Sequence, residues 1–147
     1  MKKIINGSLY NTDTARIIGE WDNGYNGSDF NFCRETLHKT KAGKYFLHGE
    51  GGPMSKYSES RGNNEWGSGE HIEPLTPETA QEWAEEHLTA DEYAAAFGEP
   101  EEAAEGREAM NLSVPTDLKV RLEKLRSEKN MSISQLVEVA VREQYGI

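Results

Sequence analysis

The segment from Met110 to Val114 alternates apolar and polar side chains and stops at Pro115, which is the pattern of one short β-strand. It is the lone strand pattern of the C-terminal region. A strand by itself leaves its backbone N–H and C=O groups unpaired on both edges, and nothing covers its apolar face. Any fold of this region must therefore supply a second strand and a cover for the first.

Two short amphipathic helices are predicted after this strand. The first covers Thr116 to Ser127, with Thr116 or Pro115 near its start, and Lys129-Asn130 interrupts its apolar spacing. Ser132-Ile133-Ser134-Gln135 is a capping box that opens the second helix. One strand and two helices are too small for an independent core, so we predict a homodimer whose strands pair antiparallel across a two-fold axis. The residues expected in the dimer core are Met110, Leu112, Val114, Leu118, Leu122, Val137 and Val141, with Val120, Leu125, Leu136 and Ala140 beside them.

Such a pairing turns Asn111 and Ser113 to the face of the ribbon that points away from the core. A two-stranded ribbon fits the DNA major groove, where asparagine makes a bidentate contact to adenine and serine reads several base edges. The sequence therefore predicts that this module contacts double-stranded DNA. The alternative is a dimerisation module of the same fold that makes no DNA contact.

The stretch from Ala109 to Tyr145 resembles the ribbon-helix-helix (Arc/MetJ-like) family of DNA-binding repressors. The likeness rests on Leu112-Ser113-Val114-Pro115, on the helix spacing and on Asn130-Met131-Ser132-Ile133-Ser134-Gln135-Leu136. The resemblance implies base contacts from the ribbon and a phosphate held at the start of the second helix. The base-contacting positions would be Asn111, Ser113 and, at the ribbon's edge, Ala109, and the phosphate-contacting positions Ser132, Ile133 and Ser134. Family ribbons often carry Arg or Lys on the reading face, and this ribbon carries neither, which lowers the expected affinity.

The charge of the chain is unevenly divided. The whole chain carries −10, but residues 110–147 contain six basic and five acidic side chains, which leaves −11 for residues 1–109. So acidic a region repels a phosphate backbone and attracts a basic protein surface. The two parts of the chain are therefore expected to have different partners.

Residues 1–98 are predicted to form a β-rich domain followed by two short helices, which makes the fold class α+β. The expected strands are Ile4-Ile5 and Leu9-Tyr10 around the Asn6-Gly7 turn, Ile17 to Trp21, and a hairpin of Thr36–Thr40 with Tyr45–His48. A long loop is expected from Ser55 to Gly69. The helices open at Thr76-Pro77 and at the Thr89-Ala90-Asp91-Glu92 capping box, and the second ends at Gly98. Residues 99–108, rich in glutamate and without a large apolar side chain, are predicted to be a linker before the domain 109–147.

No catalytic, metal or cofactor motif is assured in residues 1–98, so we predict that the protein is not an enzyme. The run Gly49 to Lys56 lacks the Gly-Lys-Ser/Thr ending of a phosphate loop, and Pro53 removes an N–H that such a loop needs. The four histidines show no metal spacing, and one cysteine, Cys33, excludes an internal disulfide and a zinc site built from cysteines. The weakest alternative is a hydrolase that uses His48 and Glu50.

The three tryptophans are expected in the core: Trp21, Trp66 and Trp83. Trp66 lies in a Gly/Asn-rich stretch and is the one expected to touch a partner, and Glu50 is the second candidate for a partner surface. No apolar run approaches the roughly 20 residues that a bilayer span requires, and the N-terminus lacks a signal-peptide pattern. The expected location is therefore the cytoplasm.

A second resemblance covers roughly Lys2 to Gly98. It is carried by Lys3–Gly7, Tyr45–Gly52, Gly62–Trp66 and Ile72–Thr76, which look like a recurrent small domain of bacterial mobile elements, phage or plasmid. Some type II-A anti-CRISPR proteins are similar over this region. The resemblance implies an inhibitor of a Cas9-type effector or its guide-RNA complex, whose nucleic-acid channel is strongly basic. A C-terminal DNA-binding domain would then repress the protein's own operon. The alternative is a plain ribbon-helix-helix repressor or antitoxin-like regulator with an acidic protein-binding domain.

Overall fold

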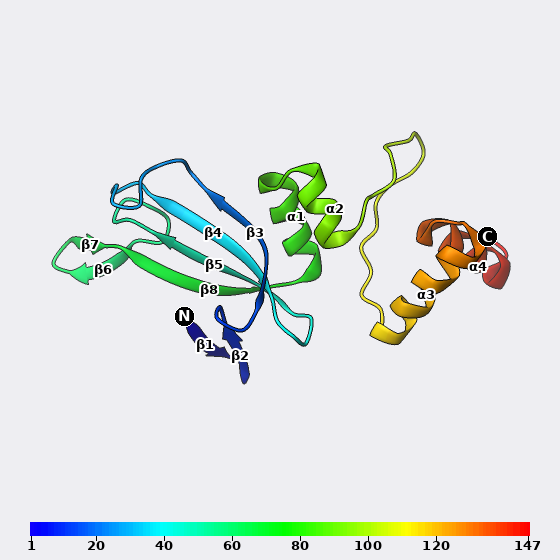
Figure 1. Ribbon diagram of the computed structural model, residues 1–147, viewed down its shortest axis with the longest axis horizontal. Coiled ribbons are helices and arrows are strands. Elements are labelled where there is room, and N and C mark those ends of the chain that lie inside the picture. The colour runs from blue at the N-terminus through cyan, green and yellow to red at the C-terminus, as the bar shows by residue number, and fades with distance from the viewer. The chain divides into compact units, whose positions relative to one another are not determined.

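The computed structural model describes all residues from Met1 to Ile147, and the chain divides into two compact units, Met1–Arg107 and Glu108–Ile147. Eight strands in three sheets and four helices make the protein a mixed α+β protein, which confirms the predicted class (Figure 1). None of the helices combines the length and the apolar character needed to cross a membrane.

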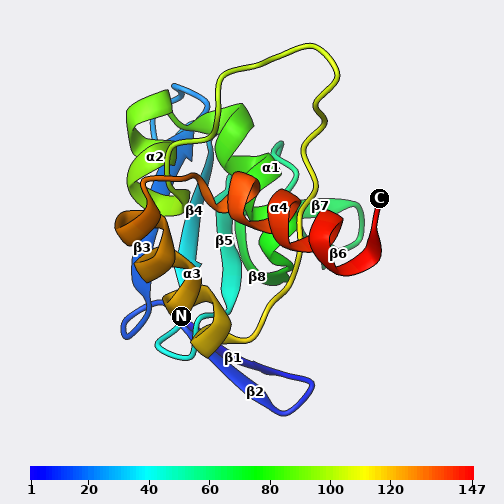
Figure 2. The ribbon, with the colours of Figure 1, turned by 90° about the vertical axis from the view of Figure 1, so that its right-hand side faces the viewer.

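A four-stranded antiparallel sheet is the centre of the first unit. Its strands follow the order β3-β4-β5-β8, which Figure 2 shows side by side. They span Arg16–Asp22 (β3), Cys33–Lys39 (β4), Tyr45–Gly51 (β5) and Gly69–Leu75 (β8). The predicted hairpin between β4 and β5 is confirmed, because Lys39 pairs with Tyr45 and the Thr40 N–H donates to the Lys44 carbonyl at 2.8 Å.

Two helices follow the sheet, α1 (Pro77–His87) and α2 (Ala90–Phe97). Their predicted starts are confirmed: the Thr76 side chain accepts the Thr79 N–H, and Thr89 and Glu92 form a complete capping box. α1 packs on one face of the sheet. The shared core contains Leu37, Tyr45, Leu47, Ala80, Trp83 and Ala84, with Trp21, Leu88 and Phe97 packed against it.

The N-terminal hairpin covers part of the opposite face. β1 (Lys2–Ile5) and β2 (Ser8–Asn11) pair around Asn6 and Gly7, as predicted, and both turn residues have positive φ, as a tight hairpin turn of this kind requires. The Tyr10 ring meets Phe46 edge-on at 5.4 Å between centroids, and the His38 ring stacks on Phe46 at 4.9 Å. Phe46 and His38 are therefore buried on a face that no helix covers.

The prediction of one long loop from Ser55 to Gly69 is wrong. This segment contains a second small hairpin, β6 (Glu59–Gly62) and β7 (Glu65–Gly67), which turns at Asn63 and Asn64, both with positive φ. Both strands are almost entirely exposed, so no core imposed an apolar alternation that the sequence would reveal. The hairpin projects from the end of the sheet opposite α1 and α2 (Figure 1). Trp66 lies on it and is 59% exposed, so the prediction that Trp66 is a core residue is also wrong.

The second unit consists of α3 (Thr116–Lys129) and α4 (Ile133–Tyr145), preceded by residues 98–115 without helix or strand. α3 ends at Asn130 in the left-handed conformation, and the predicted capping box of Ser132 and Gln135 opens α4. Residues 110–114 form no strand in the single chain, and no side chain of residues 108–147 is buried. The expected strand and core are therefore absent from one copy, because the prediction gives the pairing strand to a second copy.

Candidate functional site

The apolar side chains of the second unit lie exposed along the segment before α3 and on both helices. Met110 is 78% exposed and Leu112 64%, and the other exposed apolar residues include Val114, Leu118, Val120, Leu125, Val137, Val139 and Val141. Leu122, Ile133 and Leu136 are half-buried. A unit without a buried side chain cannot offset the conformational entropy that its ordering costs. This apolar face therefore needs a cover from outside the single chain.

The residues expected to contact DNA are all accessible. Ala109, Asn111 and Ser113 are exposed in the segment before α3, and the latter two alternate with exposed apolar residues. At the start of α4, the Ser132 hydroxyl accepts the Gln135 N–H at 3.1 Å, and the Ser132 N–H donates to the Gln135 side chain at 2.9 Å. The cap thus occupies Ser132. The backbone N–H groups of the first helical residues, Ile133 and Ser134, lie outside the helical ladder and remain the donors suited to an anion.

A buried carboxylate that the sequence did not reveal lies under α1. Glu35 of β4 is 1% exposed and accepts hydrogen bonds from Trp83 Nε1 at 2.7 Å and from the Tyr57 hydroxyl at 2.8 Å. Lys56 forms an ion pair with the same carboxylate, and His87 Nε2 lies 3.9 Å from it. One sequence signal was available: Glu35 is in phase with Cys33 and Leu37, the strand positions that face the helices.

The charge states in this cluster argue against acid–base catalysis. Burial alone raises the pKa of Glu35, but hydrogen bonds from Lys56, Trp83 and Tyr57 outweigh it and hold that pKa below its ordinary value. Burial and the neighbouring carboxylate raise the pKa of Tyr57 far above its usual range, and burial raises the pKa of the Cys33 thiol. The carboxylate therefore stays ionised, the phenol and thiol stay protonated, and the cluster ties the loop after β5 to the helix.

The glycines after β5 are explained by the same loop. A side chain at Gly49 would collide with the Tyr57 ring, and one at Gly51 with the Ser55 side chain. At Gly52 it would collide with the backbone carbonyls of Asp29 and Phe30. The glycines thus allow the chain to fold back closely on itself, which is a structural role and not that of a phosphate loop.

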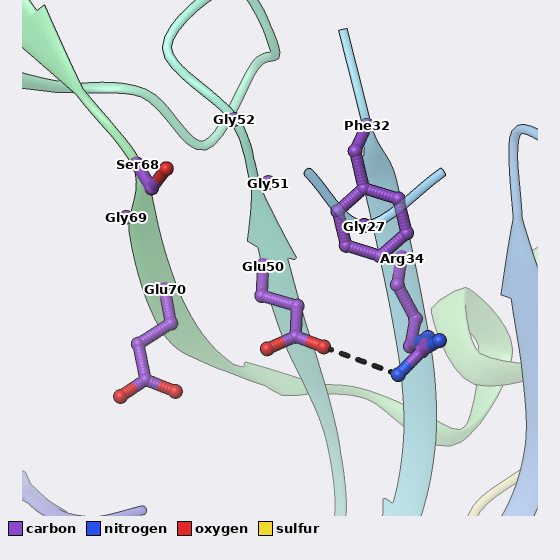
Figure 3. Close-up of a pocket in the computed structure, with 9 residues that line it drawn as sticks. All are labelled: Gly27, Phe32, Arg34, Glu50, Gly51, Gly52, Ser68, Gly69 and Glu70. Atoms are coloured by element: carbon purple, nitrogen blue, oxygen red, sulfur yellow. Dashed lines mark hydrogen bonds and ion pairs between the residues drawn. The ribbon is translucent and has the colours of Figure 1, made fainter. Parts of the chain in front are cut away.

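A shallow groove of about 560 Å³ opens at the end of the sheet that carries β6 and β7. Figure 3 shows its lining: Arg34 and Glu50 joined by an ion pair at 3.5 Å, with Glu70 beside them and the Phe32 ring against the guanidinium at 5.4 Å. The remaining lining residues are Gly27, Gly51, Gly52, Ser68 and Gly69. Glu50, a predicted partner residue, lines this groove, and Trp66 lies two residues before Ser68.

His48 and Glu50 share one face of β5, but His48 Nε2 bonds Glu70 at 2.9 Å and not Glu50. The hydrolase alternative needs these two residues to act together, and their side chains have different partners. Nowhere do three or more His, Cys, Asp or Glu side chains converge in a way that could hold a metal ion.

The negative charge is concentrated in one part of the first unit. Residues 1–72 are neutral overall, whereas residues 73–108 contain twelve acidic side chains and a single basic one, Arg107. Most of these acidic residues lie on α1, α2 and the segment after them, with Glu82, Glu85 and Glu86 exposed on α1. The −11 of the front part is therefore a property of its helices and linker, not of its sheet.

A scan of protein-family models finds no match to this chain, and searches of curated proteins and of solved structures find none either. Its function therefore has to be inferred from its own residues.

Proposed function

We propose that the protein is a dimeric DNA-binding repressor through residues 109–147 and that its acidic N-terminal domain binds and inhibits a Cas9-type effector or its guide-RNA complex. The dimer represses the operon that encodes it. One observation carries the DNA-binding half: the second unit has helices with well-formed caps but no buried side chain. Its apolar face is therefore an interface.

A second copy of the same unit is the occupant that fits this face best. Met110, Leu112 and Val114 alternate with polar residues, so an antiparallel partner strand would put both apolar rows on one side. Pro115 ends each strand and opens α3, so four helices would close over that side. Self-pairing also satisfies the backbone groups of residues 110–114, which a covering helix would not do.

DNA contact follows from what this pairing leaves outside. Asn111 and Ser113 would face the major groove, and the Ile133 and Ser134 amides would face a phosphate. The ribbon itself has no basic residue, but α3 carries more basic than acidic side chains, and its basic residues are exposed: Lys119, Arg121, Lys124, Arg126 and Lys129. They supply the attraction to the phosphate backbone that the ribbon lacks.

The inhibitory half rests on charge and on the resemblance of residues 2–98 to anti-CRISPR proteins. A segment with twelve acidic side chains and one basic residue would be repelled by DNA but attracted by the basic nucleic-acid channel of an effector. A plain repressor or antitoxin-like regulator is the second candidate, because the same acidic surface would also fit another basic protein.

Two measurements on the full chain test the proposal. Sedimentation over a range of concentrations should give a dimer, and that dimer should shift a DNA fragment from upstream of its own gene more strongly than a scrambled fragment. A monomer with stable α3 and α4 would contradict the DNA-binding half. Added to a Cas9-type effector with its guide RNA, the full chain should prevent target cleavage. DNA binding without any effect on cleavage would favour the plain repressor.

A further inference from the structure

We propose that the groove at the β6–β7 end of the sheet binds an arginine side chain of a protein partner, with the exposed aromatic residues around it contacting that partner's apolar surface. The proposal deepens the protein-binding half of the proposed function, on which it rests. It joins the two partner residues expected from the sequence, Glu50 and Trp66, in one surface.

The groove contains a row of charges that crosses the whole sheet. Asp22 pairs in register with Arg34, Arg34 with Glu50, and Glu50 with Glu70, so one residue from each strand lies on the same face. The four lie at or next to the ends of their strands, beside the loops that leave the sheet. The row therefore holds three carboxylates and one guanidinium.

The internal partners do not neutralise this row. Glu50 and Glu70 are direct cross-strand neighbours, an arrangement of like charges that destabilises a sheet. The Arg34–Glu50 pair is 3.5 Å long and about half exposed, and pairs of this kind are weak and easily exchanged. Three glycines in the lining, Gly51, Gly52 and Gly69, leave open space beside the carboxylates. A negative, accessible recess of this form attracts a cation.

The rim of the groove is apolar and exposed. Tyr25 and Phe30 come from the loop between β3 and β4, Met54 from the loop after β5, and Trp66 from β7, and each side chain is more than half exposed. The Met54 N–H donates to the Phe30 carbonyl at 2.8 Å, which holds two of these loops together. Large apolar side chains grouped around a polar recess are typical of a protein-docking surface.

The chemistry of the recess favours guanidinium over other cations. A guanidinium donates in a planar fork to carboxylates and also stacks on an aromatic ring, and the groove offers Glu50, Glu70 and the Phe32 ring together. Arg34 already lies over that ring at 5.4 Å, so the ring accepts a guanidinium within this chain. A metal ion lacks the three converging ligands that it needs, and nucleic acid would be repelled by the carboxylates.

The first test uses ethylguanidinium as the probe, titrated into the isotope-labelled full chain at constant ionic strength, with ethylammonium as the comparison. We expect amide shifts centred on Arg34, Glu50 and Glu70 that are larger for ethylguanidinium. The double variant Glu50→Gln/Glu70→Gln should abolish them. The matched control Glu82→Gln/Glu85→Gln, which removes the same charge from α1, should leave them unchanged. Shifts that follow all acidic positions alike, or that are equal for the two probes, would overturn the proposal.

The second test measures binding of the full chain to a purified Cas9-type effector. The Glu50→Gln/Glu70→Gln and Trp66→Ala variants should each weaken binding by about tenfold or more, and the α1 control should bind much more like the wild type. If wild-type chain does not bind the effector while ethylguanidinium still maps to the row, the proposed effector is wrong and the arginine site stands. If the effector binds equally to all variants, the site is wrong and the effector stands.

Discussion

The two units of this chain have helices of the same local quality and opposite degrees of burial. α2 and α4 both begin with a complete capping box, yet α1 and α2 belong to a unit with a buried core and α3 and α4 to one without. In the first unit Leu37, Phe46 and Ile72 are almost completely inaccessible. The difference teaches that caps and periodicity form helices, whereas only a covered apolar face makes a unit stable.

The largest expected effect breaks the dimer that we propose for the second unit. Leu112→Ala should cost about 2–5 kcal/mol per site, and hence twice that per dimer, because a core side chain is lost from each strand. Sedimentation should report a shift to monomer, and urea unfolding should report early loss of helix from residues 116–145 only. Asn111→Ala is the matched control: it should leave the dimer intact and weaken specific DNA binding by about 1–3 kcal/mol. Equal effects of the two variants on dimerisation would refute the proposed strand facing.

The next effect is confined to the first unit. Glu35→Ala should destabilise it by about 3–5 kcal/mol, because Trp83, Tyr57 and Lys56 lose a buried common partner. Chemical unfolding monitored by tryptophan fluorescence measures the loss, since all three tryptophans lie in this unit. Glu82→Gln, at an exposed position of α1, is the control and should change stability little. An unchanged dimer affinity in Glu35→Ala would support the independence of the two units.

Acid should also distinguish the units. Burial, together with the charges of His48 and the N-terminus, lowers the pKa of His38 to about 4, and its Nδ1 is buried without a hydrogen-bond partner. The unfolded chain therefore binds a proton that the folded chain refuses, so stability is complete above pH 6.5 and falls as the pH drops toward 4. The loss should be about 1–3 kcal/mol, as linkage requires for such a shift.

Thermal unfolding of the first unit between pH 7 and 4 measures this effect. His38→Phe should flatten the profile in that range. Below it, stability should fall again as Glu35, whose pKa is lowered in the fold, becomes protonated. A profile that His38→Phe leaves unchanged would show that another group causes the loss.

The smallest effect addresses the shared local signal. Thr89→Ala and Ser132→Ala each remove the side-chain acceptor of a capping box and should each cost about 1 kcal/mol in their own unit. Helix content against temperature, followed by circular dichroism, measures both. Very different costs would mean that the helices depend on their caps to different degrees.

Much of the local structure was predictable because its signals are local. Asn6-Gly7, Thr76-Pro77 and the capping boxes of Thr89 and Ser132 satisfy backbone groups within a few residues, so they marked their hairpin and helices correctly. The β6–β7 hairpin escaped because its strands bury nothing and so carry no alternation.

The candidate sites were predictable only in part. Glu50 and Trp66 were expected at a partner surface, but Arg34, Glu70 and Phe32 were not, because a groove between strands depends on register across the sheet. Glu35 was missed for the same reason, since its donors come from Lys56, Tyr57 and Trp83, the last of them 48 residues away.

The sequence alone determined where the helices begin and end, where the chain divides its charge, and that residues 110–114 need a strand from elsewhere. Those properties follow from neighbouring residues and from composition. Tertiary structure alone decided that Glu35 is buried and ionised, that His38 refuses a proton, and that Asp22, Arg34, Glu50 and Glu70 form one row. Each depends on atoms that are far apart along the chain and meet only when the sheet, its loops and α1 have packed.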